Sequence, residues 1–364
     1  VELPVSASDA RYPLQKLHVL VNNVPVFGTA GKDIPAANSQ QFQQKIRLEL
    51  SQGQNYIQVY ATNSRGIASL KEEVNIRCTS SDVLPKLHLV CIGVSEHQQN
   101  HMNLQFADDD AREIAATFGR VRGFAKVNRR VILNTEATRQ NILQMKEQLQ
   151  QTAVDDYVMI FYAGHGLLHP ETWELYLSTW DTDFDHPEKQ ALPYQELESL
   201  LDGIPARQKV LVMDACHSGE FDSEGQEAAI AASTTTVSGG LDFGFVDAPA
   251  AAAAPVSTDL SGQETFQLMK QAFADLRLSS GAVVISSASG DQKALEKAEF
   301  GGHGAFTHCL LQGLKQQKAD LDKDGNVRVS ELKRFLFSAV PAVTGNSQQP
   351  TTRTENLRHD FVIW

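Results

Sequence analysis

Cys216 and His165 are the two residues whose types and surroundings suggest that they carry out chemistry together. Each follows a run of apolar residues, in segments 157–166 (YVMIFYAGHG) and 209–219 (KVLVMDACHSG). Short apolar runs bounded by turn residues predict strands buried on both faces, as parallel sheets require. Parallel strands present reactive side chains at their carboxyl ends. We therefore expect the thiol and the imidazole to meet at one sheet edge, as a nucleophile and its base.

Other chemistries fit these residues less well. A zinc site needs three or four ligands, and although His165, Cys216 and His217 could supply some, the chain has no C-x-x-C pair. A serine hydrolase would need a Gly-x-Ser-x-Gly elbow, which is also absent. An inert buried thiol beside a structural histidine is the plainest alternative. His303, in a second Gly-His-Gly, competes for the role of base, but it follows a polar loop and not a buried strand.

The motifs FYAGHG (161–166) and DACHSG (214–219) resemble those of the caspase and metacaspase group of cysteine peptidases, especially its bacterial caspase-like members. The likeness extends from about Lys86 to Trp364 and includes LQFADDDA (104–111), ISSASGDQKALE (285–296) and HGAFT (303–307). Caspase nucleophiles have their histidine roughly 50 residues upstream, and the two residues here are 51 apart.

This resemblance implies a fold and an activity. The fold would be α/β, with a caspase-like, mostly parallel sheet covered by helices on both faces. The activity would be that of a cysteine endopeptidase that acts on protein or peptide substrates and needs no cofactor for its chemistry. A catalytically idle caspase-fold module that binds a partner is the alternative.

The resemblance also assigns roles to individual residues. Cys216 would be the nucleophile and His165 the group that accepts its proton. The backbone N–H groups of Gly166 and Cys216 would form the oxyanion hole. Ser286 and Ser287, within the ISSAS motif, would belong to the substrate-binding set. No third residue that orients the histidine can be identified.

Charge predicts which residue precedes the bond that is cut. Asp214 stands two residues before Cys216, so its side chain should leave the strand on the same face. Asp110 matches a second acidic position in metacaspase-like pockets, although a carboxylate at a helix start is also favoured by the helix dipole. Two carboxylates favour Arg or Lys and repel Asp. We expect cleavage after basic residues, with an Asp-specific caspase-like peptidase as the alternative.

This specificity has a consequence for self-cleavage. Residues 221–269 contain no Lys or Arg but do contain Asp222, Asp242, Asp247 and Asp259. An enzyme that cuts after basic residues could not cut itself there. We expect the protein to work as a single chain, or to be cut at flanking sites such as Lys270.

Acidic residues suggest calcium as an activator or structural ion at two places. Asp320, Asp322, Asp324 and Glu331 match positions 1, 3, 5 and 12 of an EF-hand loop, with Gly325 at position 6. An Asp-Gly turn that leads into a capped helix would explain the same residues without a metal.

The second calcium candidate comprises Asp181, Asp183, Asp185 and Asp222. These residues lie near the position where calcium-dependent metacaspases hold their activating ion. A solvated acidic loop is the alternative explanation.

Composition excludes several functions. The 364 residues carry a formal charge of −12 and no basic tract, so binding to nucleic acid is not expected. No apolar stretch approaches the ~20 residues that span a bilayer, so no membrane association is expected. The four cysteines show no paired spacing, and a catalytic thiolate suits a reducing, cytoplasmic location.

The chain is predicted to divide into two domains. Residues 1–81 alternate in polarity around turn clusters and should form a small all-β sandwich of the immunoglobulin-like sort. Residues 82–364 should form the peptidase domain, with a flexible loop at about 222–262. Similar sandwiches join WD repeats to bacterial caspase-like domains, so we expect an upstream sensor or scaffold. The chain begins without Met, which suggests a piece of a longer product.

In the second domain, strands and helices should alternate. We expect strands at 87–94, 130–133, 157–163, 175–177, 209–213, 282–287 and 359–364, and helices at 107–121, 138–151, 194–201, 264–278, 305–314 and 330–340.

Overall fold

The computed structural model describes residues 1–35, 40–79, 83–169, 171–172, 174–215, 280–287, 295–353 and 360–364. Several predictions concern residues outside these ranges: Cys216, Asp222, the loop at 222–262, the helix at 264–278 and the self-cleavage segment 221–269.

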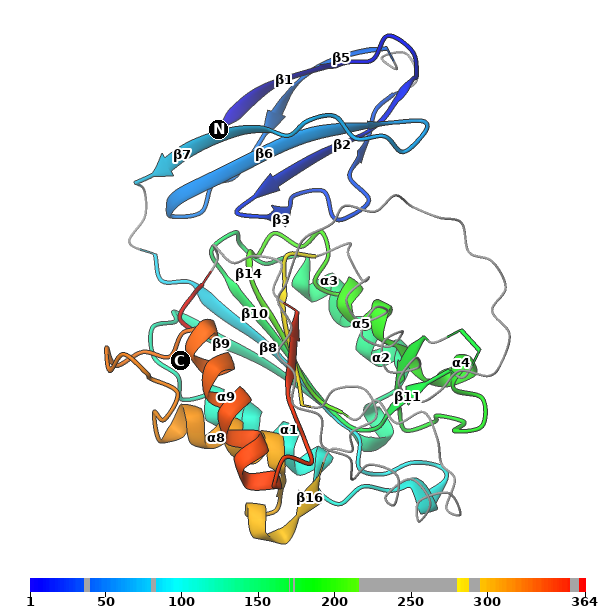
Figure 1. The fold of residues 1–364 in the computed structure, drawn as a ribbon, viewed down its shortest axis with the longest axis vertical. Coiled ribbons are helices and arrows are strands. Elements are labelled where there is room, and N and C mark those ends of the chain that lie inside the picture. Colours follow the sequence, from blue (N-terminus) through cyan, green and yellow to red (C-terminus); the bar gives the residue numbers. More distant parts are fainter. Residues whose placement is uncertain are drawn as a thin grey trace, which may run out of the picture.

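A six-stranded sheet forms the centre of the larger part of the chain (Figure 1). Its order is β18-β15-β14-β10-β8-β9, and every neighbouring pair is parallel except β15 with β18. The prediction of a mostly parallel α/β sheet is confirmed. The strands are β8 (Lys86–Gly93), β9 (Lys126–Leu133), β10 (Tyr157–Ala163), β14 (Gln208–Asp214), β15 (Val283–Ser286) and β18 (Thr351–Arg353).

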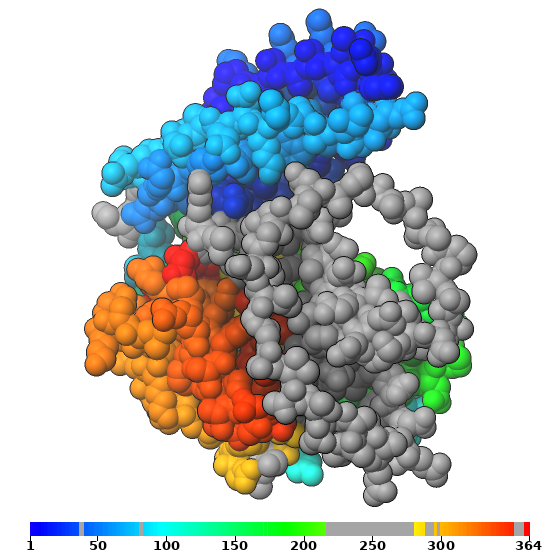
Figure 2. Space-filling model, in the orientation of Figure 1, coloured from blue at the N-terminus to red at the C-terminus, as the bar shows by residue number. Residues whose placement is uncertain are grey.

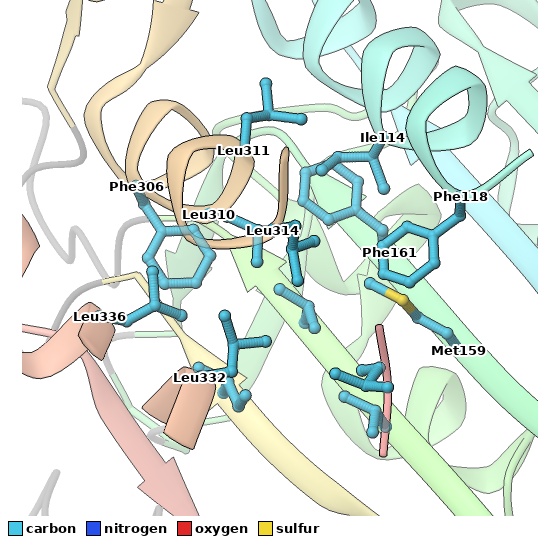
Figure 3. Packing of buried hydrophobic residues seen from close by; sticks show 14 of the residues in the cluster. Ile114, Phe118, Met159, Phe161, Phe306, Leu310, Leu311, Leu314, Leu332 and Leu336 are labelled. Carbon is cyan, nitrogen blue, oxygen red and sulfur yellow. The ribbon is translucent and has the colours of Figure 1, made fainter. Parts of the chain in front are cut away.

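Helices cover both faces of this sheet, because its strands are apolar on both sides. One face packs against α1 (Ala107–Phe118), α8 (Ala305–Lys315) and α9 (Val329–Thr344). Figure 3 shows this core, where Phe161 of the sheet lies among Ile114, Phe306 and Leu310 from the helices. The other face packs against α2 (Arg139–Leu143), α3 (Met145–Leu149) and α5 (Tyr194–Ser199).

Shorter elements surround the carboxyl ends of the strands. A three-stranded sheet follows β10 along the chain, and a two-stranded ribbon precedes α8. They comprise η2 (Asn100–Met102), η3 (Asn134–Glu136), β11 (Gly166–Leu168), β12 (Leu175–Leu177), α4 (Pro187–Gln190), β13 (Leu192–Pro193), β16 (Glu296–Lys297), η4 (Ala298–Phe300) and β17 (His303–Gly304).

The N-terminal residues form two further antiparallel sheets that enclose a buried apolar cluster. Phe42 and Ile46 from one sheet pack with Leu17, Val19 and Ile57 from the other. This arrangement agrees with a β-sandwich, while its immunoglobulin-like character and the boundary between residues 81 and 82 stay predictions. The strands are β1 (Glu2–Ser8) and β5 (Gln41–Arg47) in one sheet, and β2 (Leu14–Val21), β3 (Val24–Pro25), β4 (Lys32–Asp33), β6 (Gly53–Asn63) and β7 (Glu72–Cys78) in the other.

The N-terminal sheets rest on the loops that precede the parallel strands (Figure 1). In the space-filling view they form one end of the molecule (Figure 2). The backbone N–H of Thr29 donates to Asp202 at 2.9 Å, and that of Gln52 donates to Asp155 at 3.1 Å. Asp155 precedes β10 and Asp202 precedes β14. The N-terminal sheets therefore lie at the amino ends of these strands, away from the edge at which β10 ends and His165 follows.

The expected strand at 359–364 is wrong for its described residues. The last strand of the central sheet is β18, and in the tail Val362 makes a single bridge to Arg328. Residues 361–364 are all apolar, and Phe361 and Ile363 are buried in the core beside α9. A short apolar run alone does not distinguish this packing from a buried sheet strand.

Among the helices of the described residues, none is both long and apolar enough to cross a membrane.

Arg207→Ala tests the contact between the N-terminal sheets and the larger part of the chain. The buried guanidinium donates to Ser51 Oγ at 2.6 Å and also to the Glu49 carbonyl. Losing a charged donor to these oxygens should lower the free energy of unfolding by about 2–3 kcal/mol, measured by urea denaturation. Arg122→Ala is the control, because Arg122 is exposed, and it should cost less than about 0.5 kcal/mol. Equal losses of stability in the two variants would contradict the role of Arg207 in this contact.

Candidate active site

The backbone around His165 is held on both sides by Ser178. The His165 N–H donates to Ser178 Oγ at 3.1 Å, and the Ser178 N–H donates to the His165 carbonyl at 2.9 Å. Tyr162, fully buried in β10, donates its hydroxyl to the Ser178 carbonyl at 2.8 Å. These bonds fix the turn between β10 and β11, on which the imidazole stands.

The His165 ring is oriented by the Met102 carbonyl, which lies 2.7 Å from Nε2. A carbonyl can only accept a hydrogen bond, so Nε2 carries the proton and the basic lone pair of the neutral ring is on Nδ1. The ring also contacts His97 and Phe184, with centroids 5.3 Å and 5.5 Å away. The Met102 carbonyl is the orienting group that the sequence did not reveal.

Burial keeps this imidazole neutral. It lowers the pKa of His165, and the bond to the Met102 carbonyl opposes that shift without reversing it. Burial, with a smaller contribution from His165, lowers the pKa of the neighbouring His97 to about 3. His165 can therefore accept a proton at neutral pH, as a general base must.

The strand that leads to Cys216 ends level with the one that leads to His165. Ala163 of β10 pairs with Asp214 of β14, and the Gly164 N–H donates to the Asp214 carbonyl at 3.2 Å. Both strands therefore end at one sheet edge, two residues before the predicted catalytic groups. Cys216 itself lies outside the described residues, so the dyad stays a prediction.

An acidic pocket adjoins His165, with about 30 Å³ of free volume. Both predicted pocket carboxylates, Asp110 and Asp214, line it together with a third, Glu296. Glu296 closes the ISSASGDQKALE motif, but nothing in the sequence predicted that β16 would return it to this place. The lining residues are Leu104, Ala107, Asp110, Ala163, Gly164, His165, Asp214, Glu296 and Gly304.

The start of α8 satisfies two of these carboxylates. Thr307 donates to Asp214 Oδ2 from its backbone N–H at 3.2 Å and from its hydroxyl at 2.7 Å. The Gly304 N–H donates to Asp110 Oδ2 at 3.1 Å. N–H groups at a helix start lack partners within the helix and favour negative charge. A Cβ atom on Gly304 would lie 2.7 Å from Asp214 Oδ2, so the close approach requires glycine.

Burial makes the negative charge of the pocket costly. It raises the pKa of Asp110 to about 7; the bond to His303 opposes this shift and the nearby Asp214 adds to it. Burial also raises the pKa of Asp214, against the bonds from Thr307, and that of Glu296. A positive charge near these carboxylates would stabilise their ionised forms, whereas a further negative charge would destabilise them.

A comparison with protein families identifies the family to which these residues belong. A family model described as the caspase domain matches residues 88–362. The chain belongs to the caspase-domain family. The match begins within β8 and ends in the C-terminal tail, so it includes His165, the pocket carboxylates and the helices around them. A comparison with curated proteins gave no match. This family is one of cysteine peptidases, so membership supports a peptidase that acts on protein or peptide substrates.

Ser286 and Ser287 are fully buried and are not among the residues that line the pocket. The Ser287 hydroxyl donates to the Ala215 carbonyl at 3.2 Å, directly before Cys216. The Ser287 backbone N–H donates to the Met213 carbonyl at 2.8 Å. These contacts support a role in holding the end of β14, while direct contact with substrate stays a prediction.

The EF-hand-like loop of the caspase domain brings together three of its four predicted ligands. One carboxylate oxygen from each of Asp320, Asp322 and Asp324 lies within 4.8 Å of the others. Glu331, the expected bidentate ligand, instead accepts backbone N–H bonds from Leu321 at 2.9 Å and Arg328 at 2.9 Å. It would have to give up these bonds to bind calcium, so calcium at this loop stays a prediction.

The second predicted calcium set is described only in part. Asp181 accepts a bond from the Thr179 hydroxyl at 2.9 Å, and Asp183 pairs with Lys189 at 3.5 Å. Within the described ranges they form no group close enough to share an ion. Asp222 lies outside those ranges, so the set as a whole stays a prediction.

Tyr162→Phe tests the support of the His165 turn. Loss of the hydroxyl leaves the buried Ser178 carbonyl without this donor, which should cost about 1–2 kcal/mol of stability and lower kcat. Thermal denaturation and peptidase assays measure the two effects. Tyr157→Phe is the control, because within the described residues no hydrogen bond is found for the Tyr157 hydroxyl. A Tyr162→Phe enzyme with the stability and kcat of the control would contradict this role.

Proposed function

We propose that the protein is a cysteine endopeptidase that cleaves after Arg or Lys, with Cys216 as nucleophile and His165 as base. The observation that carries the specificity is the pocket beside His165, which three carboxylates from α1, β14 and β16 line. The family supports the general chemistry, and the pocket supports the choice of substrate.

The orientation of His165 supports the proton transfers. A thiol with a pKa of ~8.5 is mostly protonated at neutral pH and needs a base. With Nε2–H bonded to the Met102 carbonyl, Nδ1 is the nitrogen that takes the proton from Cys216. The thiolate attacks the substrate carbonyl, and the imidazolium then protonates the departing amine. Water hydrolyses the thioester that remains.

The backbone is proposed to stabilise the tetrahedral intermediate. Its oxyanion would accept hydrogen bonds from the N–H groups of Gly166 and Cys216, each at the carboxyl end of one of the paired strands. Such donors act on charge that develops only during the reaction, so they accelerate the chemical step and not substrate binding alone.

Electrostatics favour a basic side chain over Asp in the pocket. A guanidinium or ammonium group would offset the buried charge of Asp110, Asp214 and Glu296. An Asp side chain would add a fourth carboxylate, and the described lining contains no Lys or Arg to receive it. The Asp-specific alternative is therefore disfavoured. Calcium, an upstream sensor and a cytoplasmic location are not needed for this mechanism and stay predictions.

A panel of fluorogenic peptides with Arg, Lys or Asp before the cut tests the proposal. We expect cleavage of the Arg and Lys peptides, and a loss of at least about 10³-fold in kcat for Cys216→Ala or His165→Ala. Asp110→Asn and Asp214→Asn should each lower kcat/KM for the Arg peptide by roughly 10- to 100-fold.

Asp109→Asn is the matched control, because it removes the charge of a neighbouring residue whose side chain is exposed. It should leave kcat/KM unchanged. Faster cleavage after Asp would reverse the specificity. If no peptide is cut and a peptidyl-Arg chloromethylketone does not alkylate Cys216, the protein is an idle binding module.

The same specificity predicts the pattern of self-cleavage. Residues 221–269 contain no Lys or Arg, so the purified enzyme should not cut itself within them. Intact-mass and peptide mass spectrometry after prolonged incubation should find either one chain or cuts at flanking sites such as Lys270. A cut after Asp242 or Asp247 would contradict basic specificity.

A further inference from the structure

His303 pairs with a carboxylate of the pocket but does not line the pocket itself. Its Nδ1 lies 2.7 Å from Asp110 Oδ1, and the His303 side chain is 19% exposed against 2% for that of Asp110. The pair joins β17 to α1, across 193 positions of the chain. The peptidase mechanism above assigns no role to His303.

Asp110 needs a positive partner because it is deeply buried close to a second carboxylate, Asp214. Burial without a partner favours the protonated, neutral form of a carboxyl group over the charged form. A protonated carboxyl group attracts a guanidinium far less than a carboxylate does. The selectivity of the pocket therefore depends on whatever keeps Asp110 ionised.

Two bonds fix the plane of this carboxylate. His303 Nδ1 occupies Oδ1, and the Gly304 N–H occupies Oδ2 at 3.1 Å. Each oxygen can accept more than one hydrogen bond, so the side of Asp110 that lines the pocket retains acceptor capacity. The two donors are consecutive residues, so both bonds to Asp110 come from the short strand β17.

The groups that face His303 favour its charged form. Asp110 and Glu113 of α1 act on it, and it interacts directly with the charge of Asp214 on β14; Lys315 of α8 is the opposing cation. Its strand partner on β16 is Lys297. The bond to Asp110 raises the pKa of His303, and burial opposes this.

We propose that His303 is a positioning residue of the specificity pocket: it keeps Asp110 ionised and oriented, so that the pocket selects a basic side chain. This inference rests on the proposed cleavage after Arg or Lys. It also gives the Gly-His-Gly at 302–304 a role distinct from that of the catalytic base.

The test compares kcat/KM for a peptidyl-Arg substrate with that for its neutral isostere, peptidyl-citrulline, between pH 5.5 and 9. The ratio of the two cancels the titration of Cys216 and His165, which both substrates share. In the wild type the ratio should rise with pH as Asp110 ionises.

His303→Asn keeps a hydrogen-bond donor near the position of Nδ1 but removes the charge. Without that charge Asp110 ionises at a higher pH, so the midpoint of the ratio should move up by about one pH unit. At pH 7, close to the midpoint expected for Asp110 in the wild type, the ratio should then fall roughly fivefold. His303→Gln also removes the charge, although its amide lies one carbon further out, and it serves as the second variant if His303→Asn does not fold.

His308→Asn is the matched control, because the ring of His308 bonds to the Phe300 carbonyl at 2.8 Å and does not line the pocket. It should leave the midpoint in place. A wild type with no preference for Arg over citrulline would overturn both the proposed specificity and this inference. A wild type that prefers Arg, with His303 variants whose ratio is unchanged or higher, would overturn this inference alone.

Nuclear magnetic resonance of the wild type gives a second measurement that needs no variant. The His303 ring should titrate above its ordinary pKa of 6.5, and Asp110→Asn should bring that titration back down. A ring that titrates at or below 6.5 in the wild type would also overturn the inference.

Discussion

The pairing of Ala163 with Asp214 across two parallel strands is the constraint on which the rest of the site depends. Side chains alternate along a strand, so a shift of one residue would turn Asp214 away from the pocket. A shift of β10 by one residue would instead turn Tyr162 toward the other layer of helices. Each of β10 and β14 has apolar side chains on both faces, and both faces must be covered by helices. This requirement fixes the register of the strands and therefore the position of the site.

The pocket is assembled from distant parts of the chain because buried carboxylates need donors. Asp110 and Asp214 come from elements that precede residue 216, while Gly304 and Thr307 belong to elements that follow residue 279. Their hydrogen bonds tie the two parts together and also define the charge of the pocket. A carboxylate lost from this set would leave buried donors unpaired, so the residues that set specificity also contribute to stability.

The sequence predicted the strands that carry the candidate catalytic residues, because each is a recognisable run of apolar side chains. The strands that end before His165 and at Asp214 are buried on both faces, and their apolar runs were sufficient to place them. The Met102 carbonyl could not be predicted, because every residue has a carbonyl and only tertiary structure selects one. Glu296 required knowledge of how β16 returns to the pocket. The apolar run at 361–364 misled because a segment that packs on the core beside a helix needs the same residues as a buried strand.

The N-terminal sheets contact the amino ends of the central strands, and the candidate catalytic groups lie at their carboxyl ends. They contact Asp155, Asp202 and Arg207, which precede β10 and β14, whereas the candidate catalytic groups follow those strands. A seven-residue strand spans roughly 23 Å, so this contact cannot touch a substrate at the far edge. It holds the amino ends of the two strands in place, and because their register is continuous, it resists the sliding that would separate His165 from the end of β14. Among the described residues, the N-terminal sheets are thus placed to support the amino ends of these strands, at the opposite end from His165.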